Sequence, residues 1–317
     1  MRLCLMVEGQ EDVSWEQWCA LAEATEAAGL DGFFRSDHYL STIGGDDRGA
    51  LDAWTTLAGL AARTQRIRLG TLVSPVTFRH PAVLAKSAAT VDHISGGRVE
   101  LGIGAGWNEP EHAAYGFPFP DLRVRMEMLA EQIEIVHRLW TDTHVGFEGL
   151  HYRLEDCTAL PRPLQRPRPP LILGGVAGPR SVALAVRFAD EYNTTFAGAD
   201  EVRERRARVL EGCRRVGRAP STLRFSLMTA ALIGRDRSEV RELARLALRR
   251  FDDPDGDPDA LLERRADTWI TGTPEEAVAR LQELEKLGVE RVYLQHLAHE
   301  AVEMVSLVGA EVAPAVS

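Results

Sequence analysis

The sequence lacks the features that mark secreted, zinc-stapled and membrane-spanning proteins. Its four cysteines, Cys4, Cys19, Cys157 and Cys213, are far apart and form no C-x-x-C pair, which excludes a disulfide framework and a structural zinc site. No apolar run approaches the roughly 20 residues of a membrane span, and the N-terminus reaches Glu8 too early for a signal peptide. We therefore expect a cytoplasmic protein with no membrane partner.

Positive charge is scarce relative to negative charge. The 317 residues contain 37 Lys and Arg against 47 Asp and Glu, which gives a formal net charge of −10. Nucleic acids and anionic membranes both need a local excess of basic side chains. The charge balance therefore excludes them as main partners and favours a small-molecule substrate.

Several catalytic motifs are also missing. The sequence contains no G-x-x-x-x-G-K-[ST], no H-E-x-x-H and no G-x-S-x-G, so P-loop, zincin and α/β-hydrolase chemistries have no carrier. Glu109, Glu111 and His112 are close in sequence, but their spacing supplies no complete set of metal ligands. We expect no metal site.

What the sequence does contain is a regular alternation of short apolar runs and longer amphipathic stretches, which is typical of a parallel sheet wrapped in helices. Eight strand-and-helix pairs favour a TIM (β/α)8 barrel over a doubly wound sheet, and no linker divides the chain, so we expect one domain over residues 1–317. The predicted strands are Leu3–Val7, Gly32–Ser36, Ile67–Val73, Val99–Ile103, Pro170–Leu173, Glu191–Thr195, Arg224–Leu232 and Arg291–Gln295.

Two segments break the alternation, Thr141–Pro169 and Gly234–Ile270. We interpret them as insertions after the fourth and seventh strands. Loops that follow strands in such a barrel open onto the catalytic face, so both are expected to be lids or mobile connectors there.

Catalytic groups of a TIM barrel lie at the C-terminal ends of its strands. The first strand is followed by Glu8 and the second by Asp37 and His38. A histidine exchanges protons near neutral pH, and an adjacent carboxylate can orient it or bind a cofactor hydroxyl. The alternatives are that Asp37 caps the next segment, that His38 is merely half-exposed, and that Glu8 is a surface carboxylate.

The third and fourth strands end in small residues. Thr71, Val73 and Ser74 predict a flat wall against which a planar ring fits, although Pro75 can equally mark an ordinary strand end. After the fourth strand, alternate glycines would let a ligand approach the backbone, and an amide side chain could hydrogen-bond its edge. The residues of this segment that we expect at the ligand are Gly104, Ala105, Gly106 and Asn108.

The fifth strand runs into a glycine-rich turn and then a helix. Unpaired amides at a helix N-terminus form a natural seat for a phosphate, although the turn can also be purely structural. The expected phosphate contacts are Gly174, Gly175, Val176 and Ala177. The basic run Arg162–Arg168 precedes this turn and is either a solvated loop or a contact for an anionic tail.

Taken in order, residues 29–38, 66–81, 92–102 and 272–276 resemble the luciferase-like monooxygenase superfamily, specifically its bacterial branch of deazaflavin-dependent oxidoreductases. The resemblance implies a TIM barrel that binds coenzyme F420 or FMN at its mouth. It implies that Asp37 and His38 lie beside the ring, that His38 transfers the proton, and that a non-proline cis peptide at Val73–Ser74 bulges against the ring. By the same resemblance Asn108 touches the ring edge or ribityl chain.

One position departs from this family. Its sugar-phosphate dehydrogenases have a glutamate where this chain has Ala105, so the proton must come from His38, Glu8, Glu109 or water. We expect hydride transfer between F420 and a small organic substrate, with an FMN-dependent monooxygenase as the alternative and a cofactor-binding barrel without turnover as the non-enzymatic one. Family analogy predicts a homodimer. The substrate pocket is expected to draw on aromatic residues that can equally be core, namely Phe78, Trp107, Tyr115, Phe196 and Trp269.

Overall fold

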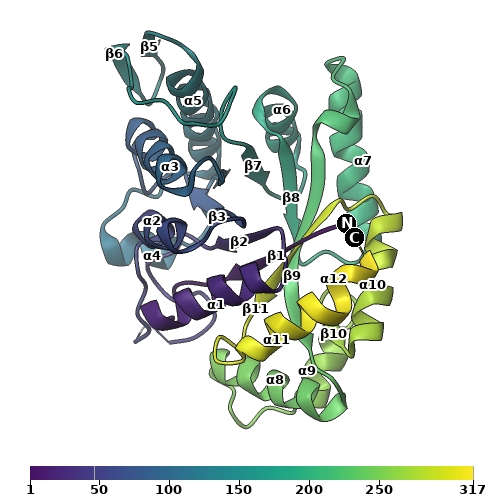
Figure 1. The fold of residues 1–317 in the computed structure, drawn as a ribbon. Helices are drawn as coiled ribbons and strands as arrows, with labels where there is room; N and C mark the ends of the chain where they lie inside the picture. Colours follow the sequence, from purple (N-terminus) through teal and green to yellow (C-terminus); the bar gives the residue numbers. More distant parts are fainter. Residues whose placement is uncertain (46, 317) are drawn as a thin grey trace.

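The computed structural model describes residues 1–45 and 47–316, and eight parallel strands in it close into a barrel (Figure 1). Each strand pairs with the next, and the pairings of β8 with β9 and of β11 with β1 complete the cylinder. All eight lie where the sequence pattern predicts them, which confirms the TIM barrel. They are β1 (Arg2–Val7), β2 (Gly32–Arg35), β3 (Arg68–Pro75), β4 (Val99–Gly104), β7 (Leu171–Gly174), β8 (Glu191–Thr195), β9 (Arg224–Ile233) and β11 (Arg291–His296).

Helices cover the outside of the barrel, as predicted, and local sequence signals start them. Ser14 and Gln17 form a capping box at the first helix, and Thr273 and Glu276 form another at the last long one. The main covering helices are α1 (Trp15–Ala27), α2 (Ala53–Arg63), α3 (Pro81–Ser95), α5 (Leu122–Thr141), α6 (Pro179–Phe188), α7 (Ala199–Arg215), α10 (Pro274–Lys286) and α11 (Val302–Leu307), followed by a π-helical turn (Val308–Val312) and α12 (Ala313–Val316).

Further elements were not predicted. They are α4 (Glu109–Tyr115), the antiparallel strands β5 (Val145–Glu148) and β6 (Arg153–Cys157), a 3₁₀ turn (Pro220–Thr222), α8 (Arg237–Arg250), α9 (Pro258–Arg265) and β10 (Ile270–Gly272). The strand β10 pairs with the outer end of β9, on the edge that β8 leaves free. The second predicted insertion is therefore largely helical, and it does follow a barrel strand.

The first predicted insertion is placed differently from our expectation. Segment 141–169 follows helix α5 rather than a strand, and its hairpin lies on the outer side of α5 (Figure 1). The Glu131 carboxylate of α5 accepts the backbone N–H groups of Leu150, His151 and Tyr152, which fixes the hairpin there. The segment that follows β4 at the mouth is instead residues 105–121, which contain α4.

The barrel interior has an apolar layer. It is a cluster of buried side chains on which Val73 packs from the C-terminal side: Cys4, Met6, Phe34, Leu72, Ile172, Met228 and Tyr293.

Toward the N-terminal ends of the strands the interior is ionic. The buried Arg291 guanidinium donates to Glu100 at 2.7 Å and lies 3.3 Å from Glu191, whose other oxygen accepts the Tyr293 hydroxyl at 2.6 Å. Arg68 and Arg224 reach the same two carboxylates from the edge of the barrel. The lower half of the cylinder is thus filled.

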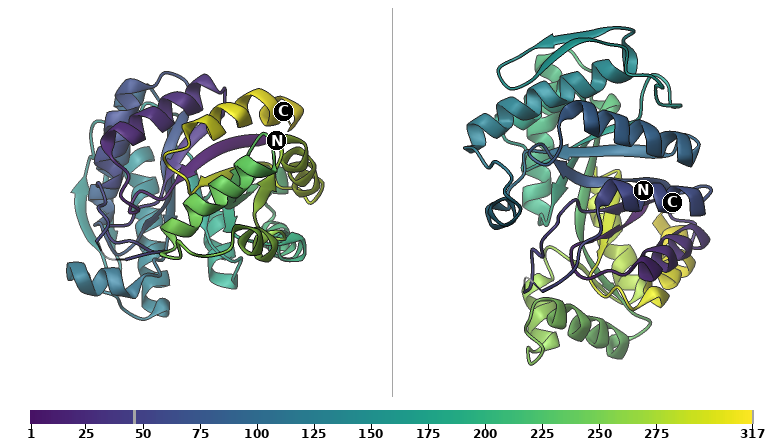
Figure 2. Two further views of the ribbon diagram at one scale, coloured as in Figure 1. Left: turned by 90° about the horizontal axis from the view of Figure 1, so that it is seen from below. Right: turned by 90° about the vertical axis from the view of Figure 1, so that its left-hand side faces the viewer.

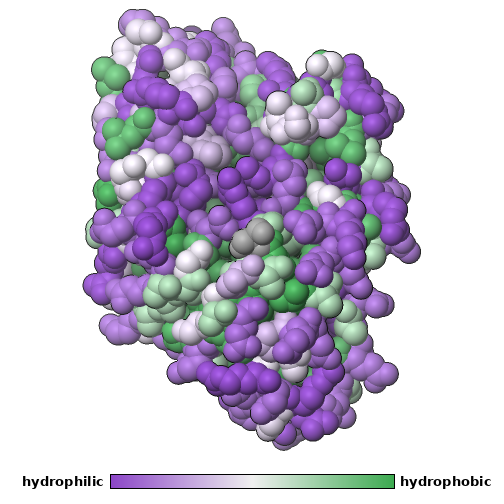
Figure 3. Space-filling view, turned by 45° about the vertical axis from the view of Figure 1, so that its right-hand side comes forward, coloured by the Kyte–Doolittle hydropathy of each residue, from purple (hydrophilic) through white to green (hydrophobic). Residues whose placement is uncertain are grey.

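The two ends of the described chain lie side by side in both views of Figure 2. The Met1 ammonium donates to the Val316 carbonyl at 2.5 Å, which ties the first strand to the last helix. The face shown in Figure 3 is mostly hydrophilic, with apolar side chains gathered near its middle. Within residues 1–45 and 47–316, no helix combines the length and the apolar character that crossing a bilayer requires.

Candidate active site

His38, which directly follows β2, is joined to a carboxylate that sequence reasoning did not assign to it. Its Nδ1 lies 2.7 Å from Oε2 of Glu111 on α4, 73 residues further along the chain. The other Glu111 oxygen accepts the backbone N–H groups of Tyr39 and Leu40. Glu111 is fully buried, whereas 15% of the His38 side chain remains exposed. The imidazole is therefore anchored through Nδ1, and within the described residues Nε2 has no hydrogen-bond partner.

The surroundings of His38 favour its protonated form. Burial acts to lower the pKa of His38, but the hydrogen bond and charge of Glu111, with smaller contributions from Glu8 and Asp37, raise it above the ordinary value. Conversely, burial acts to raise the pKa of Glu111, and the hydrogen bond and charge of His38 outweigh it and lower that pKa. The Glu111 carboxylate thus fixes the ring and favours its protonated form.

Local sequence explains why Glu111 reaches His38. Pro110 lies in the first turn of α4 and Gly116 ends the helix in the left-handed conformation with φ of 69°, so the helix has two turns and a fixed direction. The neighbouring His112 is also buried, donating from Nδ1 to the Asn108 carbonyl at 2.6 Å and accepting from the Thr77 hydroxyl at 2.5 Å. His112 locks α4 onto the loop after β3.

Asp37 is held by a separate network. Its Oδ2 accepts the Ser74 hydroxyl and the Arg79 guanidinium, each at 2.6 Å, and Arg79 also bonds Asp52 at 2.6 Å. Asp37 is 1% exposed, yet its Oδ1 has no hydrogen-bond partner within the described chain. A buried carboxylate oxygen without a donor is a place for a ligand N–H or O–H.

The end of β3 forms a bulge, and glycines make room for it. One residue of β3 is in excess between Thr71 and Ser74, and Val73 is half-buried there. A Cβ at Gly104 would lie 2.8 Å from Val73 Cγ2, and one at Gly174 would lie 3.2 Å from Cγ1. The spaced glycines of the sequence are thus explained by close packing around Val73.

The non-proline cis peptide lies one residue earlier than the resemblance implied. It joins Leu72 to Val73, not Val73 to Ser74. Ser74 has already rejoined the ladder opposite Ile103, so the extra residue is accommodated before it. The Thr71 hydroxyl donates to the Gly102 carbonyl at 2.9 Å and faces into the sheet rather than the mouth.

Glu8 lies at the end of β1 and is 8% exposed. Its two oxygens accept the side-chain amides of Gln295 at 2.5 Å and Gln10 at 2.8 Å. This arrangement makes Glu8 a hydrogen-bond acceptor close enough to contribute to the field at His38.

The turn after β7 presents fewer free amides than the sequence indicates. The N–H of Gly175 donates to the Asn193 carbonyl at 3.0 Å, and that of Ala177 donates to the Tyr192 hydroxyl at 2.7 Å. Within the described residues, the N–H groups of Val176, Gly178 and Arg180 make no such bond. The open anion-binding edge therefore starts at Val176 and continues into the first turn of α6.

The basic run Arg162–Arg168 lies elsewhere. Arg168 bonds Asp190 at 2.5 Å; Arg168 lies three residues before β7 and Asp190 directly before β8, at the N-terminal end of the barrel. Arg162 and Arg166 donate to the carbonyls of Asp142 and Pro163. The expectation that this run meets an anionic tail beside the phosphate turn is wrong, because a segment before a strand reaches the opposite rim.

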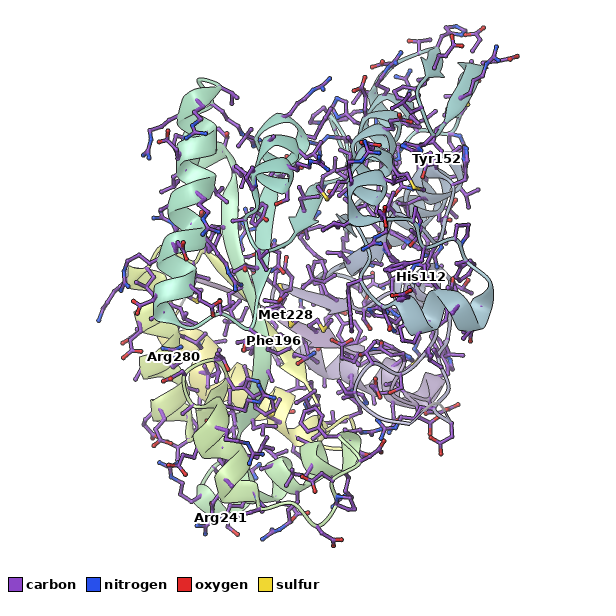
Figure 4. All side chains as sticks on the ribbon, turned by 180° about the vertical axis from the view of Figure 1, so that it is seen from behind. His112, Tyr152, Phe196, Met228, Arg241 and Arg280 are labelled. Atoms are coloured by element: carbon purple, nitrogen blue, oxygen red, sulfur yellow. The ribbon has the colours of Figure 1, made fainter. Side chains whose placement is uncertain are left out.

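Aromatic side chains surround the mouth unevenly. The Trp107 ring meets the His38 ring edge-on at 5.7 Å and is 64% exposed, whereas Phe78 and Tyr115 pack with Tyr39 in a cluster beside α4. Trp269 is buried against Phe251, away from this cluster. Figure 4 shows Phe196 beside Met228 near the middle of the barrel, with His112 on the helix to one side.

The residues fit a planar ring with an anionic end. Val73 offers a half-buried surface above the apolar layer, Asp37 offers an unpartnered acceptor, and the α6 N-terminus offers free amides. Asn108 is 7% exposed, and its side-chain amide lies 3.5 Å from Glu111. No cluster of metal-ligating side chains exists among residues 1–45 and 47–316.

Sequence reasoning missed Glu111 and Arg79 as site residues. The sequence indicated Glu111 only as a candidate metal ligand, and it gave no indication that Arg79 belongs to the site. The available signal was the proline of the Asn108-Glu109-Pro110-Glu111 segment, which is typical of a helix start.

Known proteins share this architecture. The model of the luciferase-like monooxygenase family matches residues 4–291. The chain is 31% identical over 312 residues to an F420-dependent glucose-6-phosphate dehydrogenase from Nakamurella multipartita, covering 93% of this chain and 90% of that protein. Similar solved structures include an F420-dependent secondary alcohol dehydrogenase bound to an F420–acetone adduct, with a TM-score of 0.82, 21% identity and coverage of 100% and 99%. A monooxygenase from Streptomyces bottropensis has a TM-score of 0.85 and 24% identity, with both chains fully covered.

Proposed function

The chain belongs to the luciferase-like monooxygenase family, and from that premise we propose that it is an oxidoreductase that transfers a hydride between coenzyme F420 and a small organic substrate. The similar dehydrogenase from Nakamurella multipartita is named for F420, and so is the secondary alcohol dehydrogenase of the same fold. A planar redox cofactor also suits the surface formed by Val73 and the unpartnered oxygen of Asp37.

The observation that carries the proposal is the His38–Glu111 dyad at the mouth of the barrel. Hydride transfer to a carbonyl carbon requires a proton delivered to its oxygen, and hydride transfer from a carbinol carbon requires a proton removed from the hydroxyl; the free Nε2 of His38 is the atom to exchange that proton. Because Glu111 holds Nδ1 at 2.7 Å, the ring presents Nε2 in one orientation. The raised pKa of His38 keeps more of the imidazole protonated near neutrality than in an ordinary histidine.

The cofactor, when bound, supplies the carbon that accepts or donates the hydride. The chain's own residues supply the rest. Asp37 would bind a donor on the ring through Oδ1, Asn108 would bind along its edge, and the amides of Val176 and Gly178 would bind the phosphate end. Glu8, whose two oxygens accept amide N–H groups, stabilises protonated His38 by its charge.

Cofactor choice is tested by titration. Protein purified without cofactor is titrated with F420 and with FMN, and the absorbance of each ring is followed. We expect the protein to bind F420 at least about tenfold more tightly than FMN. Tighter binding of FMN would instead support the alternative, an FMN-dependent monooxygenase, which the fold of the Streptomyces bottropensis enzyme makes the second candidate.

Two finer expectations complete the proposal. We propose a cytoplasmic location, since the four cysteines are unpaired as expected in a reducing compartment, and a homodimer by family analogy. Sedimentation of the purified protein tests the second, and a monomer at micromolar concentration would contradict it.

A further inference from the structure

We infer that the substrate carries no phosphate or carboxylate group and is an uncharged alcohol or carbonyl compound. This inference rests on the proposed function, because it concerns the substrate of the same site. The dehydrogenase from Nakamurella multipartita is named for a sugar phosphate, so the inference separates this chain from that relative.

The first observation is the acidic field at the proton-transfer group. Three carboxylates, those of Glu111, Glu8 and Asp37, contribute to the electrostatic environment of His38. Asp37 is paired with Arg79 and Glu111 with His38, whereas the Glu8 oxygens accept only the neutral amides of Gln295 and Gln10. A substrate anion bound beside Nε2 would therefore meet the field of the Glu8 carboxylate. Like charges in a partly buried site repel strongly unless a cation lies between them.

The second observation is that nearly every cation at the rim is already neutralised. Within the described residues, the segments that join each barrel strand to the next helix, together with the first turn of that helix, contain five basic side chains, Arg48, Arg79, Arg180, Arg235 and Arg237, and no lysine. Further along the segment after β4, Arg125 donates to the Pro120 carbonyl and lies over the Phe119 ring. Four of the five are paired with carboxylates.

The pairs are close. Arg48 lies 2.7 Å from Glu11, Arg79 lies 2.6 Å from both Asp37 and Asp52, and Arg235 lies 2.8 Å from Glu239. Arg237 pairs with Glu276. Two further arginines reach the rim from the bodies of helices, and they are also paired, Arg205 with Glu201 and Arg250 with Glu300.

Within the described residues, Arg180 is the member of this set that forms no ion pair with a carboxylate. It is exposed in the first turn of α6, next to the free amides of Val176 and Gly178. That is the place proposed for the phosphate of the cofactor. Among these joining segments, the one cation without a carboxylate partner therefore lies at the seat proposed for the cofactor phosphate, which leaves none of the five for a substrate anion.

The third observation is the character of the remaining rim. The exposed side chains Trp107, Val176 and Phe196 lie within three residues after β4, β7 and β8, and they are 64%, 61% and 40% exposed. Large apolar side chains in a ligand-binding mouth bind apolar ligand surface. An uncharged substrate with apolar flanks satisfies both the charge pattern and these walls.

The first experiment counts anion sites with inorganic phosphate. Phosphorus NMR follows phosphate binding to the cofactor-free protein and to protein saturated with F420. We expect one saturable site in the free protein and none in the loaded protein. A site that persists in the loaded protein overturns the inference about the substrate. If the cofactor-free protein binds no phosphate at all, the phosphate seat assigned to the N-terminus of α6 is wrong. The inference about the substrate is still supported by that result, because it shows no second anion site.

A matched pair of variants assigns the site. Arg180→Ala should weaken phosphate binding to the free protein about tenfold, whereas Arg235→Ala, which removes an equally exposed arginine already paired with Glu239, should leave it unchanged. Equal weakening by both variants would contradict the claim that pairing neutralises the rim cations.

The second experiment compares substrates that differ by one charged group. Candidate pairs are glucose with glucose 6-phosphate and butan-2-ol with 3-hydroxybutyrate, assayed by the absorbance of F420. We expect kcat/KM for the uncharged member of a pair to be at least about tenfold higher. Preference for the charged member overturns the inference, and turnover with FMN in place of F420 overturns the proposed function instead.

Discussion

Replacing Glu111 with glutamine would test how this carboxylate controls His38. The glutamine side-chain oxygen can still accept the backbone N–H groups of Tyr39 and Leu40, so the short helix α4 keeps its attachment. The side-chain amide, however, now donates to Nδ1 of His38. The imidazole must then accept at Nδ1 and carry its proton on Nε2, which removes the free base and lowers the pKa of His38.

The size of the effect follows from the geometry. A charge-assisted hydrogen bond at 2.7 Å with a buried partner contributes about 1.5–3 kcal/mol to stability. The pKa of His38 is raised, so its contribution is complete below the ordinary histidine value of 6.5 and is lost as the pH rises through the raised value. The pKa of Glu111 is lowered, so its contribution is complete above 4.5 and is lost as the pH falls through the lowered value. Glu111→Gln should therefore be most destabilising between pH 4.5 and 6.5.

Two measurements check this reasoning. Urea unfolding at several pH values gives the stability difference, and an NMR titration of the histidine ring protons gives the pKa of His38. The matched control is Glu109→Gln, which removes an exposed carboxylate two residues away on the same helix. A stability difference that is the same at pH 6 and pH 9, or an unchanged pKa of His38, would refute the role assigned to Glu111.

Three further outcomes are expected. His38→Ala should reduce turnover at least about 10²-fold while leaving F420 affinity within a factor of ten, and unchanged turnover would contradict its role in proton transfer. Val176→Asp should weaken F420 binding about tenfold in a fluorescence titration, because its carboxylate repels the cofactor phosphate, whereas the uncharged Val176→Asn should not. Position 176 is chosen rather than Gly175 because any Cβ at Gly175 would lie 2.8 Å from the Tyr192 hydroxyl. Arg291→Met should destabilise the protein by about 3–5 kcal/mol in denaturant unfolding, because it leaves Glu100 and Glu191 buried without their common cation, and adding Glu100→Gln and Glu191→Gln should restore part of the loss.

The barrel was predictable because its strands carry their own signal. Each of the eight is a short run, apolar for most of its length and set off by glycine, proline or polar residues, as burial on both faces favours. The buried charges of Glu100, Glu191 and Arg291 lie near the starts of their strands and do not obscure the pattern. The elements that were missed have weak local patterns. The helix α4 has seven residues, β10 has three, and α8 is so rich in arginine that its buried stripe of Val240, Leu243, Ala244 and Ala247 is hard to recognise.

The site was predictable only in part, for a different reason. Residues such as His38 and Asp37 follow a strand, so their place at the mouth comes with the fold. Glu111 meets His38 only because α4 folds back over the mouth, and Arg79 meets Asp37 across the ends of β2 and β3. Such pairings depend on tertiary structure and leave no local pattern. The amides of Gly175 and Ala177 are another case, since the neighbouring strand β8 engages both.

The filled lower half of the cylinder has a kinetic consequence. Arg291 and its two carboxylates close the N-terminal end of the barrel, so cofactor and substrate must both enter and leave at the C-terminal end. Where cofactor and substrate bind one above the other, the deeper ligand cannot dissociate until the outer ligand has left. The deeper ligand therefore binds first and dissociates last. Steady-state turnover should then follow a compulsory order, and an excess of the outer ligand should trap the inner one and slow the cycle.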